Sequence, residues 1–384
     1  MRILQTISSM GINNGGPSTC TLNLVKGLKI NGVDADVLTF DINTPNDKLI
    51  FEDSFMKIVK PSLYPRYGYS KEFRLWLIAN AIYDLYHANA LWQYSSHATI
   101  KYAFKNEKPI ILSPHGMLYP EGLKKSKWIK KLSFLLYQQE DLNRVTAFHA
   151  TSIQELRYIR DFGLDQPIAL IPNAIDPEAL GSPNFSIKKG KKKIGFMGRL
   201  VPIKNLEILL KAWAKACSGT DDAELVLIGD AQDEYKSSLI RLAEELKITN
   251  ISFIGFVTGT QKLTVLEGLN YLILPSKSEN FGMVVTEALF KGIPVIASKG
   301  TPWEELNTYN CGWWVDADIN SLSGTIIRAI TLAENDRIEM GKRGNQLVLD
   351  KYSVNAVGGM MKMFYLWLIK GGEKPTFVDL KKQI

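Results

Sequence analysis

One strand-to-helix transition indicates the fold class, and it reads Ile194-Gly195-Phe196-Met197-Gly198-Arg199-Leu200-Val201-Pro202-Ile203-Lys204-Asn205-Leu206. The apolar start predicts a buried strand that ends at Gly198, and the spacing after it predicts a helix that begins at about Asn205. The same alternation continues along the chain. We expect strands at 224–228, 251–254, 271–275 and 294–297, with helical segments between them. Alternating strands and helices with apolar strands predict a doubly wound parallel α/β sheet.

An earlier part of the chain repeats this pattern and predicts a second domain of the same class. Strands are expected at 3–8, 36–40, 88–92, 109–113, 145–150 and 168–171, and the first helix at 18–28. The pattern breaks at Asp176-Pro177, passes through a lysine-rich stretch and then restarts. We therefore expect Rossmann-like domains at 1–180 and 188–353, with the carboxyl ends of their strands facing a shared cleft.

Composition excludes several classes of protein. The chain has 384 residues, of which 46% are hydrophobic and 22% charged, so intrinsic disorder is excluded. No apolar stretch approaches the roughly 20 residues of a membrane-spanning helix. The N-terminus lacks the apolar core of a signal peptide, which predicts a cytoplasmic protein. Three widely spaced cysteines indicate neither a disulfide framework nor a zinc site. The net charge of +7 does not indicate a nucleic-acid partner.

Two lysine clusters stand out. The first surrounds Gly190 within 188–193, and its simplest interpretation is a solvated linker. The second lies within 124–131, where apolar residues alternate with the lysines. Such a segment is typical either of an amphipathic helix on an anionic membrane surface or of an exposed helix with one face in the core. The second cluster consists of Lys124, Lys125, Lys127, Lys130 and Lys131, interleaved with Trp128, Ile129 and Leu132.

The loop after the strand expected at 193–197 is a candidate anion site. It carries Arg199 and Lys204 just before the N-terminus of a helix, where backbone N–H groups and the helix dipole favour negative charge. A guanidinium and an ammonium beside them would suit a diphosphate. The alternative interpretation is that both cations are ordinary surface charges.

A second candidate stretch runs from Ser276 to Leu289 and contains Glu279 and Glu287. Glu279 is expected in the loop after a strand and Glu287 in the following helix, both at the predicted cleft. Carboxylates accept hydrogen bonds from hydroxyls, so sugars and ribose are natural partners. Gly282 would let a backbone N–H approach a ligand. The alternative is a helix with the usual acidic N-terminus.

The first domain contributes weaker signals. Gly15 and Gly16, with Pro17, follow the first strand and could border a phosphate or an acceptor, although they form no dinucleotide fingerprint. His115 follows the strand at 109–113 and could donate a hydrogen bond to a sugar hydroxyl or to a developing charge. A lone histidine in such a place is also often structural.

Metal binding is not expected. Asp-x-Asp occurs at Asp34/Asp36 and at Asp316/Asp318, and such pairs can hold Mg²⁺ with a nucleotide diphosphate. The first pair begins a strand, which is the wrong end for a ligand in the cleft. The second pair precedes a helix and indicates an N-cap.

Taken together, these motifs resemble the family 4 glycosyltransferases, which are retaining enzymes with the GT-B fold. The resemblance runs through nearly the whole chain and includes a bacterial subgroup that builds cell-surface polysaccharides. It rests on Gly15-Gly16, His115-Gly116, Asn173-Ala174-Ile175-Asp176, Gly198-Arg199-Leu200 with Lys204-Asn205, the Glu279/Glu287 segment, Thr301-Pro302-Trp303 and Cys311-Gly312-Trp313-Trp314. Ala174 departs from the glycine that the family often has there.

The resemblance implies roles for these positions. Arg199 and Lys204 would bind the donor diphosphate, Glu287 the ribose, and Glu279 the donor sugar. His115 would lie against that sugar, and a C-terminal helix within 354–384 would cross back to the first domain. The remaining expected substrate-binding residues are Gly15, Gly16, Asn173, Gly198, Asn280, Phe281, Gly282, Met283 and Val284.

The expected function is therefore retaining sugar transfer from a UDP- or GDP-sugar to a glycan or lipid-linked acceptor in O-antigen, capsule or exopolysaccharide synthesis. No metal or other cofactor is expected. The protein would be cytoplasmic, with peripheral attachment to the inner face of the plasma membrane through Lys124–Lys131. Two alternatives remain open: a sugar-nucleotide epimerase or glycan phosphorylase on the same architecture, and a non-catalytic nucleotide-sugar binder.

Overall fold

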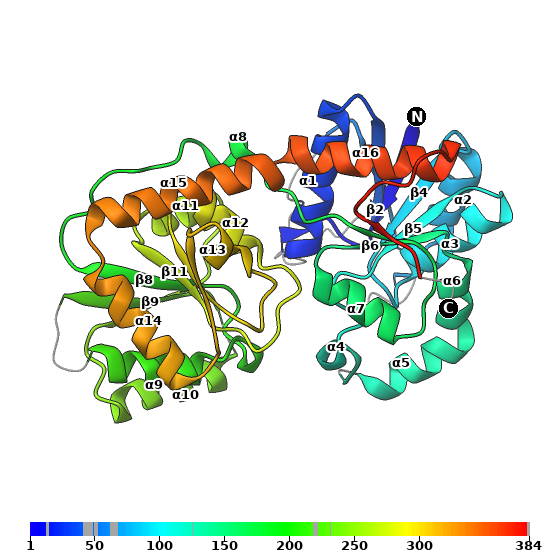
Figure 1. Ribbon diagram of the computed structural model, residues 1–384. Coiled ribbons are helices and arrows are strands. Elements are labelled where there is room, and N and C mark those ends of the chain that lie inside the picture. The colour runs from blue at the N-terminus through cyan, green and yellow to red at the C-terminus, as the bar shows by residue number, and fades with distance from the viewer. Residues whose placement is uncertain are drawn as a thin grey trace. The chain divides into compact units, whose positions relative to one another are not determined.

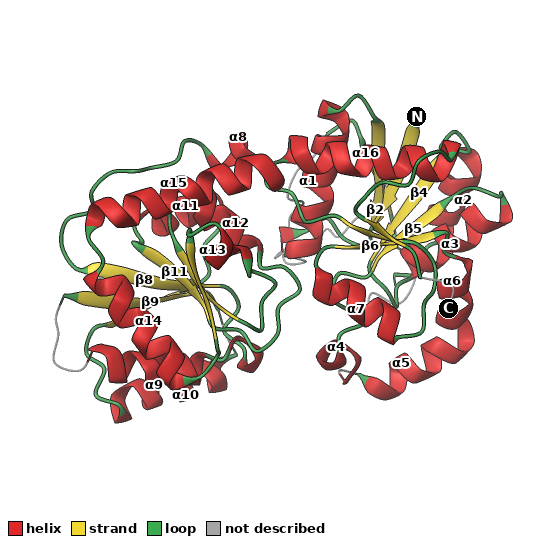
Figure 2. Cartoon of the chain, viewed as in Figure 1, coloured by secondary structure: helices red, strands yellow, loops and turns green. Residues whose placement is uncertain are grey.

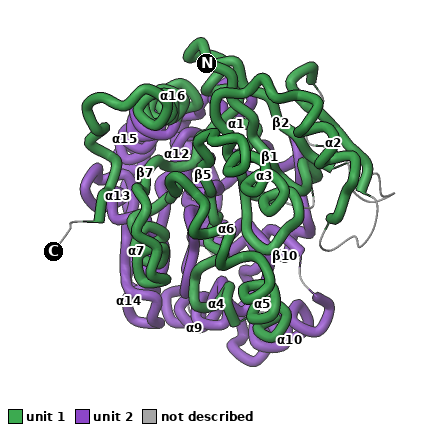
Figure 3. The backbone as a smooth tube through the Cα atoms, turned by 90° about the vertical axis from the view of Figure 1, so that its right-hand side faces the viewer, with its two compact units in different colours: residues 1–175, 353–384 green, residues 176–352 purple. Residues whose placement is uncertain are grey.

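The computed structural model describes residues 1–12, 15–40, 49, 53–61, 68–124, 126–217, 222–230 and 232–381. The chain divides into two compact units, one formed by residues 1–175 with 353–384 and the other by residues 176–352 (Figure 3). Residues 176–180, which were expected in the first domain, and residues 181–187, which lay between the expected domains, therefore belong to the second unit, and Ser353 belongs to the first.

The first unit contains a sheet of eight strands in the order β14-β7-β6-β5-β4-β1-β2-β3, counted over its described residues. All neighbouring pairs are parallel except β14 and β7. The strands are β1 Arg2–Thr6, β2 Asp34–Phe40, β3 Met56–Val59, β4 Leu85–Asn89, β5 Ile110–Ser113, β6 Ala147–Ala150, β7 Ile168–Leu170 and β14 Val378–Asp379. The prediction missed β3 and the two-residue β14.

The prediction of a strand at 88–92 was wrong by three residues. β4 ends at Asn89, and Ala90 and Trp92 have φ angles of 74° and 66°, which end an extended strand. The apolar run Ala88–Trp92 suggested a buried strand because the turn that follows β4 is also buried: Ala90 and Leu91 are 4% and 1% exposed.

Helices lie on both faces of this sheet (Figures 1 and 2). They are α1 Gly16–Ile30, α2 Lys71–Ala79, α3 Tyr94–Lys105, α4 Pro120–Lys124, α5 Lys127–Ser133, a π-helical turn Phe134–Gln138, α6 Gln139–Arg144, α7 Ile153–Asp161 and α16 Val354–Lys370. The last of these returns from the end of the chain, as expected of the C-terminal helix.

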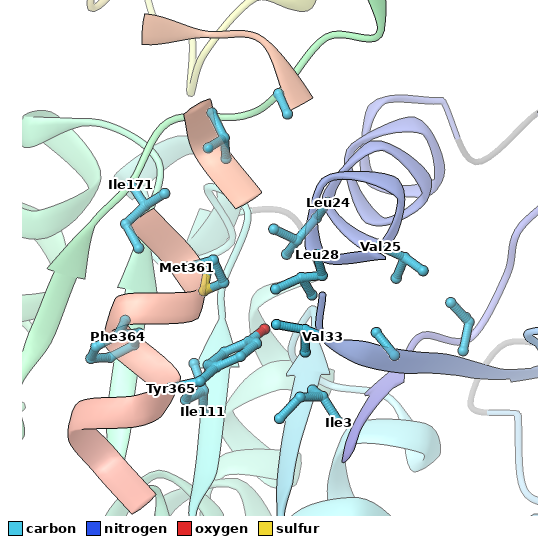
Figure 4. Close-up of a cluster of buried hydrophobic side chains, with 14 of the residues drawn as sticks. Ile3, Leu24, Val25, Leu28, Val33, Ile111, Ile171, Met361, Phe364 and Tyr365 are labelled. Carbon is cyan, nitrogen blue, oxygen red and sulfur yellow. The ribbon is translucent and has the colours of Figure 1, made fainter. Parts of the chain in front are cut away.

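The helix α16 is held by close packing against α1. Met361, Phe364 and Tyr365 are fully buried in the same apolar cluster as Leu24 and Leu28 of α1 (Figure 4). The periodic apolar face of Val354–Ile369 is the sequence feature that produces this packing.

The second unit contains a parallel sheet of six strands in its described part, in the order β10-β9-β8-β11-β12-β13. The strands are β8 Lys192–Met197, β9 Ala223–Ile228, β10 Ile251–Ile254, β11 Tyr271–Leu274, β12 Val295–Ser298 and β13 Gly312–Val315. The helices are α8 Pro177–Leu180, α9 Leu206–Cys217, α10 Asp233–Glu245, α11 Gly259–Glu267, α12 Met283–Phe290, α13 Glu305–Thr308, α14 Ile319–Thr331 and α15 Glu334–Lys351, with a 3₁₀ turn at Pro202–Lys204. The prediction missed β13.

Each sheet has one point at which its strand order reverses. In the second unit the chain winds outward from β8 through β9 to β10, and then from β11 through β12 to β13 on the other side. In the first unit the corresponding point lies between β1 and β4. Open α/β sheets bind ligands beside the carboxyl ends of the strands at such a point. A ligand site in the second unit is therefore expected at the loops that follow β8 and β11.

The interpretation of 188–193 as a solvated linker was wrong for two of its lysines. The Lys188 ammonium donates to the backbone oxygens of Glu267 and Leu269, and Lys192 donates to the oxygen of Leu332 at 2.6 Å. Burial lowers the pKa of Lys188 to about 8. These lysines anchor the start of the second unit.

The second lysine cluster lies mostly on an exposed segment. None of the residues described in α5 is buried. The interpretation of a helix with one face in the core was therefore wrong for α5. Lys125 lies outside the described residues, as do Asn13 and Asn14 of the turn before Gly15.

Candidate active site

The loop after β8 places its cations beside the start of α9. Arg199 is exposed, and the side chain of Lys204 at the end of the 3₁₀ turn is 18% exposed. Asn205 has a left-handed φ of 61° and is 2% exposed, and its side-chain amide donates to the Ala317 oxygen at 3.3 Å. This buried residue fixes the point at which the loop gives way to the helix.

The loop after β11 is held by backbone contacts to both neighbouring loops. Lys277 N–H donates to the Ile203 oxygen at 2.9 Å, and Glu279 N–H donates to the Gly300 oxygen at 2.9 Å. A Cβ atom on Gly300 would lie 2.3 Å from the Ser276 oxygen, so a larger residue at position 300 would displace the loop. These backbone hydrogen bonds fix the position of Glu279 at the carboxyl edge of the sheet.

A buried aromatic cluster supports the second half of this loop. The indole N–H of Trp303 donates to the Phe281 oxygen at 2.5 Å. The Trp303 ring lies 5.2 Å from that of Phe281 and 5.3 Å from that of Tyr352, measured between centroids. Gly282 then adopts φ 82°, which turns the chain into α12 with Met283 as its first residue and Val284 as its second. Phe281 itself is buried, and Asn280 is partly exposed.

Two ion pairs in the second unit involve predicted site residues: one joins Lys204 to Glu279, and the other joins Glu287 to Lys262, which was not predicted. The Lys204 ammonium contacts the Glu279 carboxylate. The Lys262 ammonium of α11 lies 2.6 Å from Oε1 of Glu287 on α12. Glu287 is only 8% exposed, and its other oxygen, Oε2, is buried and has no hydrogen-bond partner among the residues that the structure describes. A buried carboxylate oxygen without a partner is costly, and a ligand hydroxyl would satisfy it.

Lys262 could not be recognised from the sequence, because nothing in its spacing relates it to Glu287, 25 residues away. Asn89, which ends β4 beside the switch point of the first sheet, was also missed. A polar residue at the carboxyl end of a strand was the available signal. This signal was hidden because the predicted strand at 88–92 put Asn89 near its start instead of at its carboxyl end.

In the first unit, His115 belongs to a buried polar network. Its Nε2 lies 2.9 Å from Oδ1 of Asn89. The amide of Asn89 donates to Oε1 of Gln5 at 2.9 Å and to the backbone oxygen of Thr6 at 3.3 Å. Because a backbone oxygen only accepts, the amide nitrogen of Asn89 faces Thr6 and its oxygen faces His115.

This orientation fixes the proton on His115. Nε2 must carry the hydrogen that Asn89 accepts, so a neutral His115 has an acceptor at Nδ1. Burial, together with His149, lowers the pKa of His115 to about 3, so the ring is neutral at physiological pH. The expected role as a hydrogen-bond donor therefore does not fit Nε2, which is already used.

The same reasoning orders the rest of the network, starting from the Ile171 backbone oxygen. His149 Nε2 donates to that oxygen at 2.8 Å, so its Nδ1 accepts from the Ser113 hydroxyl at 2.7 Å. Nε2 of His87 donates to Ser113, and its Nδ1 accepts from the Tyr365 hydroxyl, both at 2.7 Å. Burial lowers the pKa of His87 far below its ordinary value and that of His149 to about 4. The network thus connects the loop after β5 to helix α16.

The other expected residues of the first unit lie around the same sheet edge. Gly15 has a left-handed φ of 68° at the N-terminus of α1, and a Cβ atom on Gly15 or Gly16 would meet no atom within 4 Å. Asn173 is 7% exposed and lines a small hollow with His115, Asn89 and Thr21. The candidate residues therefore form two groups: Gly15, Gly16, His115 and Asn173 in the first unit and all others in the second.

Neither Asp-x-Asp pair is arranged as a metal site. Asp34 pairs with Arg2 at 2.8 Å, and Asp36 accepts from the Tyr83 hydroxyl at 2.7 Å. Asp318 accepts from the N–H groups of Asn320 and Ser321 and is the N-cap of α14, as expected. Within the described part of the chain, no group of three or more His, Cys, Asp or Glu is placed to hold a metal ion. No helix there is long and apolar enough to span a membrane.

Two family models match this chain. Residues 14–179 match the family model described as Glycosyltransferase Family 4, and residues 182–347 match the model described as Glycosyl transferases group 1. The chain belongs to the family 4 glycosyltransferases. This places it in an enzyme family, and the two matched regions fall on the two units.

Two curated glycosyltransferases share parts of this sequence. The GDP-mannose-dependent monoacylated alpha-(1-6)-phosphatidylinositol monomannoside mannosyltransferase of Corynebacterium glutamicum is 26% identical over 220 residues, 53% of this chain and 57% of that protein. The D-inositol 3-phosphate glycosyltransferase of Mycobacterium leprae is 32% identical over 138 residues, 32% of this chain and 31% of that protein. The matches thus cover 57% and 31% of the lengths of these relatives.

Among solved structures, Anabaena HepE in complex with UDP and glucose is similar over the whole fold. The TM-score is 0.72 at 19% identity, and the match covers 95% of this glycosyltransferase and 99% of HepE. This likeness establishes the GT-B fold, with two Rossmann-like domains.

Proposed function

We propose that this protein transfers a sugar, with retention of anomeric configuration, from a nucleotide-sugar donor to a glycan or lipid-linked acceptor in bacterial surface polysaccharide synthesis. The observation that carries the donor assignment is the charged site at the switch point of the second sheet. There Lys204 and Glu279 meet from the loops after β8 and β11. The family to which the chain belongs supports the reaction class.

In this proposal the second unit binds the donor. Arg199, Lys204 and the N–H groups at the start of α9 hold the diphosphate, and Glu287 accepts a hydrogen bond from the ribose. Glu279 and the backbone at 281–282 contact the donor sugar, flanked by Gly198, Asn280, Met283 and Val284. Since negative charge grows on the diphosphate as the glycosidic bond breaks, fixed cations there lower the barrier to its departure.

In the first unit, His115 would face the donor sugar, and Gly15, Gly16 and Asn173 would border the phosphate and the acceptor. The neutral His115 offers an acceptor at Nδ1, so it would receive a hydrogen bond from a sugar hydroxyl. Same-face attack, with the leaving phosphate helping to deprotonate the acceptor hydroxyl, gives retention without a protein nucleophile. No metal or cofactor is needed for these steps.

We further propose that the protein binds an anionic membrane surface through the α5 segment. Trp128, Ile129, Leu132, Leu135 and Leu136 are between 59% and 81% exposed. Trp128, Ile129 and Leu132 lie in α5 with the i, i+1 and i+4 spacing of one helical stripe, and Leu135 and Leu136 lie in the π-helical turn that follows. Lys127, Lys130 and Lys131 lie among them. A lipid-linked acceptor would be within reach of a protein attached to the membrane in this way.

The donor proposal is tested by calorimetric titration of UDP, GDP and ADP and of their common sugar conjugates, without metal. We expect one nucleotide to bind, and Glu287→Ala to lose that binding. Product analysis with and without a glycan acceptor then separates transfer from epimerisation, which needs no acceptor. Absence of binding by all three nucleotides, with and without Mg²⁺, would contradict the proposal. Binding without turnover of any conjugate would favour the non-catalytic alternative.

A further inference from the structure

The pairing of Lys262 with Glu287 assigns a function to a residue that no sequence motif singles out. Lys262 lies in the first half of α11, and its side chain is 31% exposed. Glu287 lies in α12 and is almost fully buried. Their contact of 2.6 Å is made through Oε1 only. The carboxylate is therefore held by one oxygen, and the other is presented without a partner among the described residues.

Such a carboxylate is ready to accept one hydrogen bond from outside the protein. A free Oε2 that is buried from solvent has a strong preference for a donor. An ammonium group has three N–H donors, and Glu287 takes one of those of Lys262. The ion pair thus offers a ligand one acceptor, Oε2 of Glu287, and the remaining N–H donors of Lys262.

A vicinal diol has matching chemistry. Each hydroxyl can donate or accept, so one hydroxyl of the diol can donate to Oε2 while the other accepts from the Lys262 ammonium. A single hydroxyl, as in a deoxyribose, satisfies only part of this arrangement. We infer that Lys262 is a specificity-determining residue that acts with Glu287 to recognise the ribose diol of the donor nucleotide. This inference rests on the proposed function, in which Glu287 binds the ribose.

Lys262 also has a positioning role in this inference. Without the Lys262 ammonium, Oε1 of Glu287 would lose the ion pair that fixes it among the described residues, and the direction of Oε2 would no longer be determined. An arginine at position 262 keeps the charge and the donors, although its planar head differs in shape. A methionine keeps the apolar stem and removes both charge and donors.

The test compares binding of a ribonucleotide and its 2′-deoxy counterpart by calorimetry. Whichever of UDP, GDP and ADP binds most tightly to the wild-type protein is titrated together with dUDP, dGDP or dADP. We expect the wild type to prefer the ribonucleotide by at least about tenfold, the usual size of a charge-assisted hydrogen bond. Lys262→Met should bring the ratio of the two dissociation constants, deoxyribonucleotide to ribonucleotide, close to one. Lys262→Arg should restore part of the preference.

Lys342→Met is the matched control, because Lys342 also forms an ion pair, with Glu339 at 2.7 Å, on an exposed helix surface. It should keep the wild-type ratio. A wild-type ratio in Lys262→Met would overturn the role of Lys262 alone. Failure of the wild type to bind any of the three nucleotides would overturn both this inference and the proposed function. A purely structural Lys262 would weaken both nucleotides equally and leave the ratio unchanged, which would also contradict the inference.

Discussion

Lys204 and Glu279 form an ion pair that joins the loops after β8 and β11, although 75 residues separate them in the chain. Both side chains are partly buried, at 18% and 17% exposure. The cation proposed to hold the diphosphate is therefore in contact with the carboxylate proposed to hold the sugar. A bound donor would let Lys204 turn to a stronger anion and leave Glu279 to the sugar hydroxyls.

Removing either cation should impair transfer more than it impairs folding. We expect Arg199→Ala and Lys204→Met each to lower kcat about 100-fold, the usual effect of losing one preorganised donor to a developing charge. The free energy of unfolding should fall by less than about 2 kcal/mol, because neither side chain is fully buried. Steady-state kinetics and urea denaturation measure the two effects. Unchanged turnover in Arg199→Ala would refute its assignment to the diphosphate.

Substitutions at His115 should separate its two nitrogens. An asparagine places a polar group where Nδ1 stands and tolerates the left-handed φ of 52°, whereas a glutamine reaches the position of Nε2. If Nδ1 accepts from the sugar, His115→Asn should keep at least about ten times more kcat/KM than His115→Gln. With a pKa of about 3, His115 should also add no step to the pH profile of wild-type kcat/KM between pH 6 and 8. Equal loss in both variants would show that Nδ1 makes no such contact.

The buried His149 should make the protein less stable in acid. Its pKa is lowered to about 4 in the folded state from 6.5, so the unfolded chain binds the extra proton first as the pH falls. Its stabilising contribution is complete above about pH 6.5 and is lost as the pH falls toward 4. The expected loss from this residue is about 2 kcal/mol between pH 7 and pH 5. Urea denaturation measures the free energy of unfolding at pH 7 and at pH 5. The drop between these two values should be about 2 kcal/mol smaller in His149→Gln than in the wild type. An identical pH dependence in the two proteins would be evidence against a neutral, buried His149.

The contact between α1 and α16 should not tolerate a methyl group. A Cβ atom on Gly358 would lie 2.3 Å from the backbone carbon of Gly27, and one on Gly27 would lie 2.1 Å from the Val354 oxygen. We expect Gly358→Ala to lower the free energy of unfolding by about 3 kcal/mol, at the upper end of overpacking. Gly324→Ala in α14 is the control, since nothing lies within 4 Å of its Cβ position, and it should stabilise by about 0.5–1 kcal/mol. Thermal denaturation of both variants measures this, and a Gly358→Ala protein as stable as wild type would contradict the close packing.

Membrane attachment should depend on both the apolar and the basic side chains of α5. We expect the protein to sediment with vesicles of phosphatidylglycerol but less with phosphatidylcholine. Trp128→Ser with Leu136→Ser, and separately Lys127→Glu with Lys131→Glu, should each weaken sedimentation. Added salt should weaken it too, because the lysines act through screened charge. Lys342→Glu, away from this segment, serves as the charge control. Vesicle binding that neither salt nor the lysine variants reduce would rule out this surface.

Most of the fold could be predicted because strand and helix periods are local properties. The apolar runs of β1, β5, β8, β9 and β11 are short, and each lies within a residue or two of its predicted position. Two of the missed strands carry weaker signals than the four-residue strands that were predicted: β3 contains the charged Lys57, and β13 begins with Gly312, a residue type that is depleted in strands. The resemblance of spaced motifs to a known family supplied the fold class and the enzyme class, which the comparisons support.

The candidate site shows the limit of that reasoning. From the sequence, Arg199, Lys204 and Glu279 could be placed in loops at strand ends and Glu287 in the helix that follows, because alternation of strand and helix determines which loops share an edge. The ion pairs could not be predicted. Whether Lys204 contacts Glu279 depends on the order of β8 and β11 in the sheet, and whether Lys262 contacts Glu287 depends on how α11 packs beside α12.

The proton positions in the first unit were decided only by the tertiary structure. In the sequence, His115 is a histidine after a strand, with both nitrogens equivalent. In the folded chain, the Thr6 oxygen orients Asn89 and thereby places the hydrogen of His115 on Nε2. The sequence by itself thus determined the elements and the chemical groups available to the site. Packing decided their partners, because hydrogen bonds and ion pairs require contact between segments whose separation along the chain carries no information about distance in space.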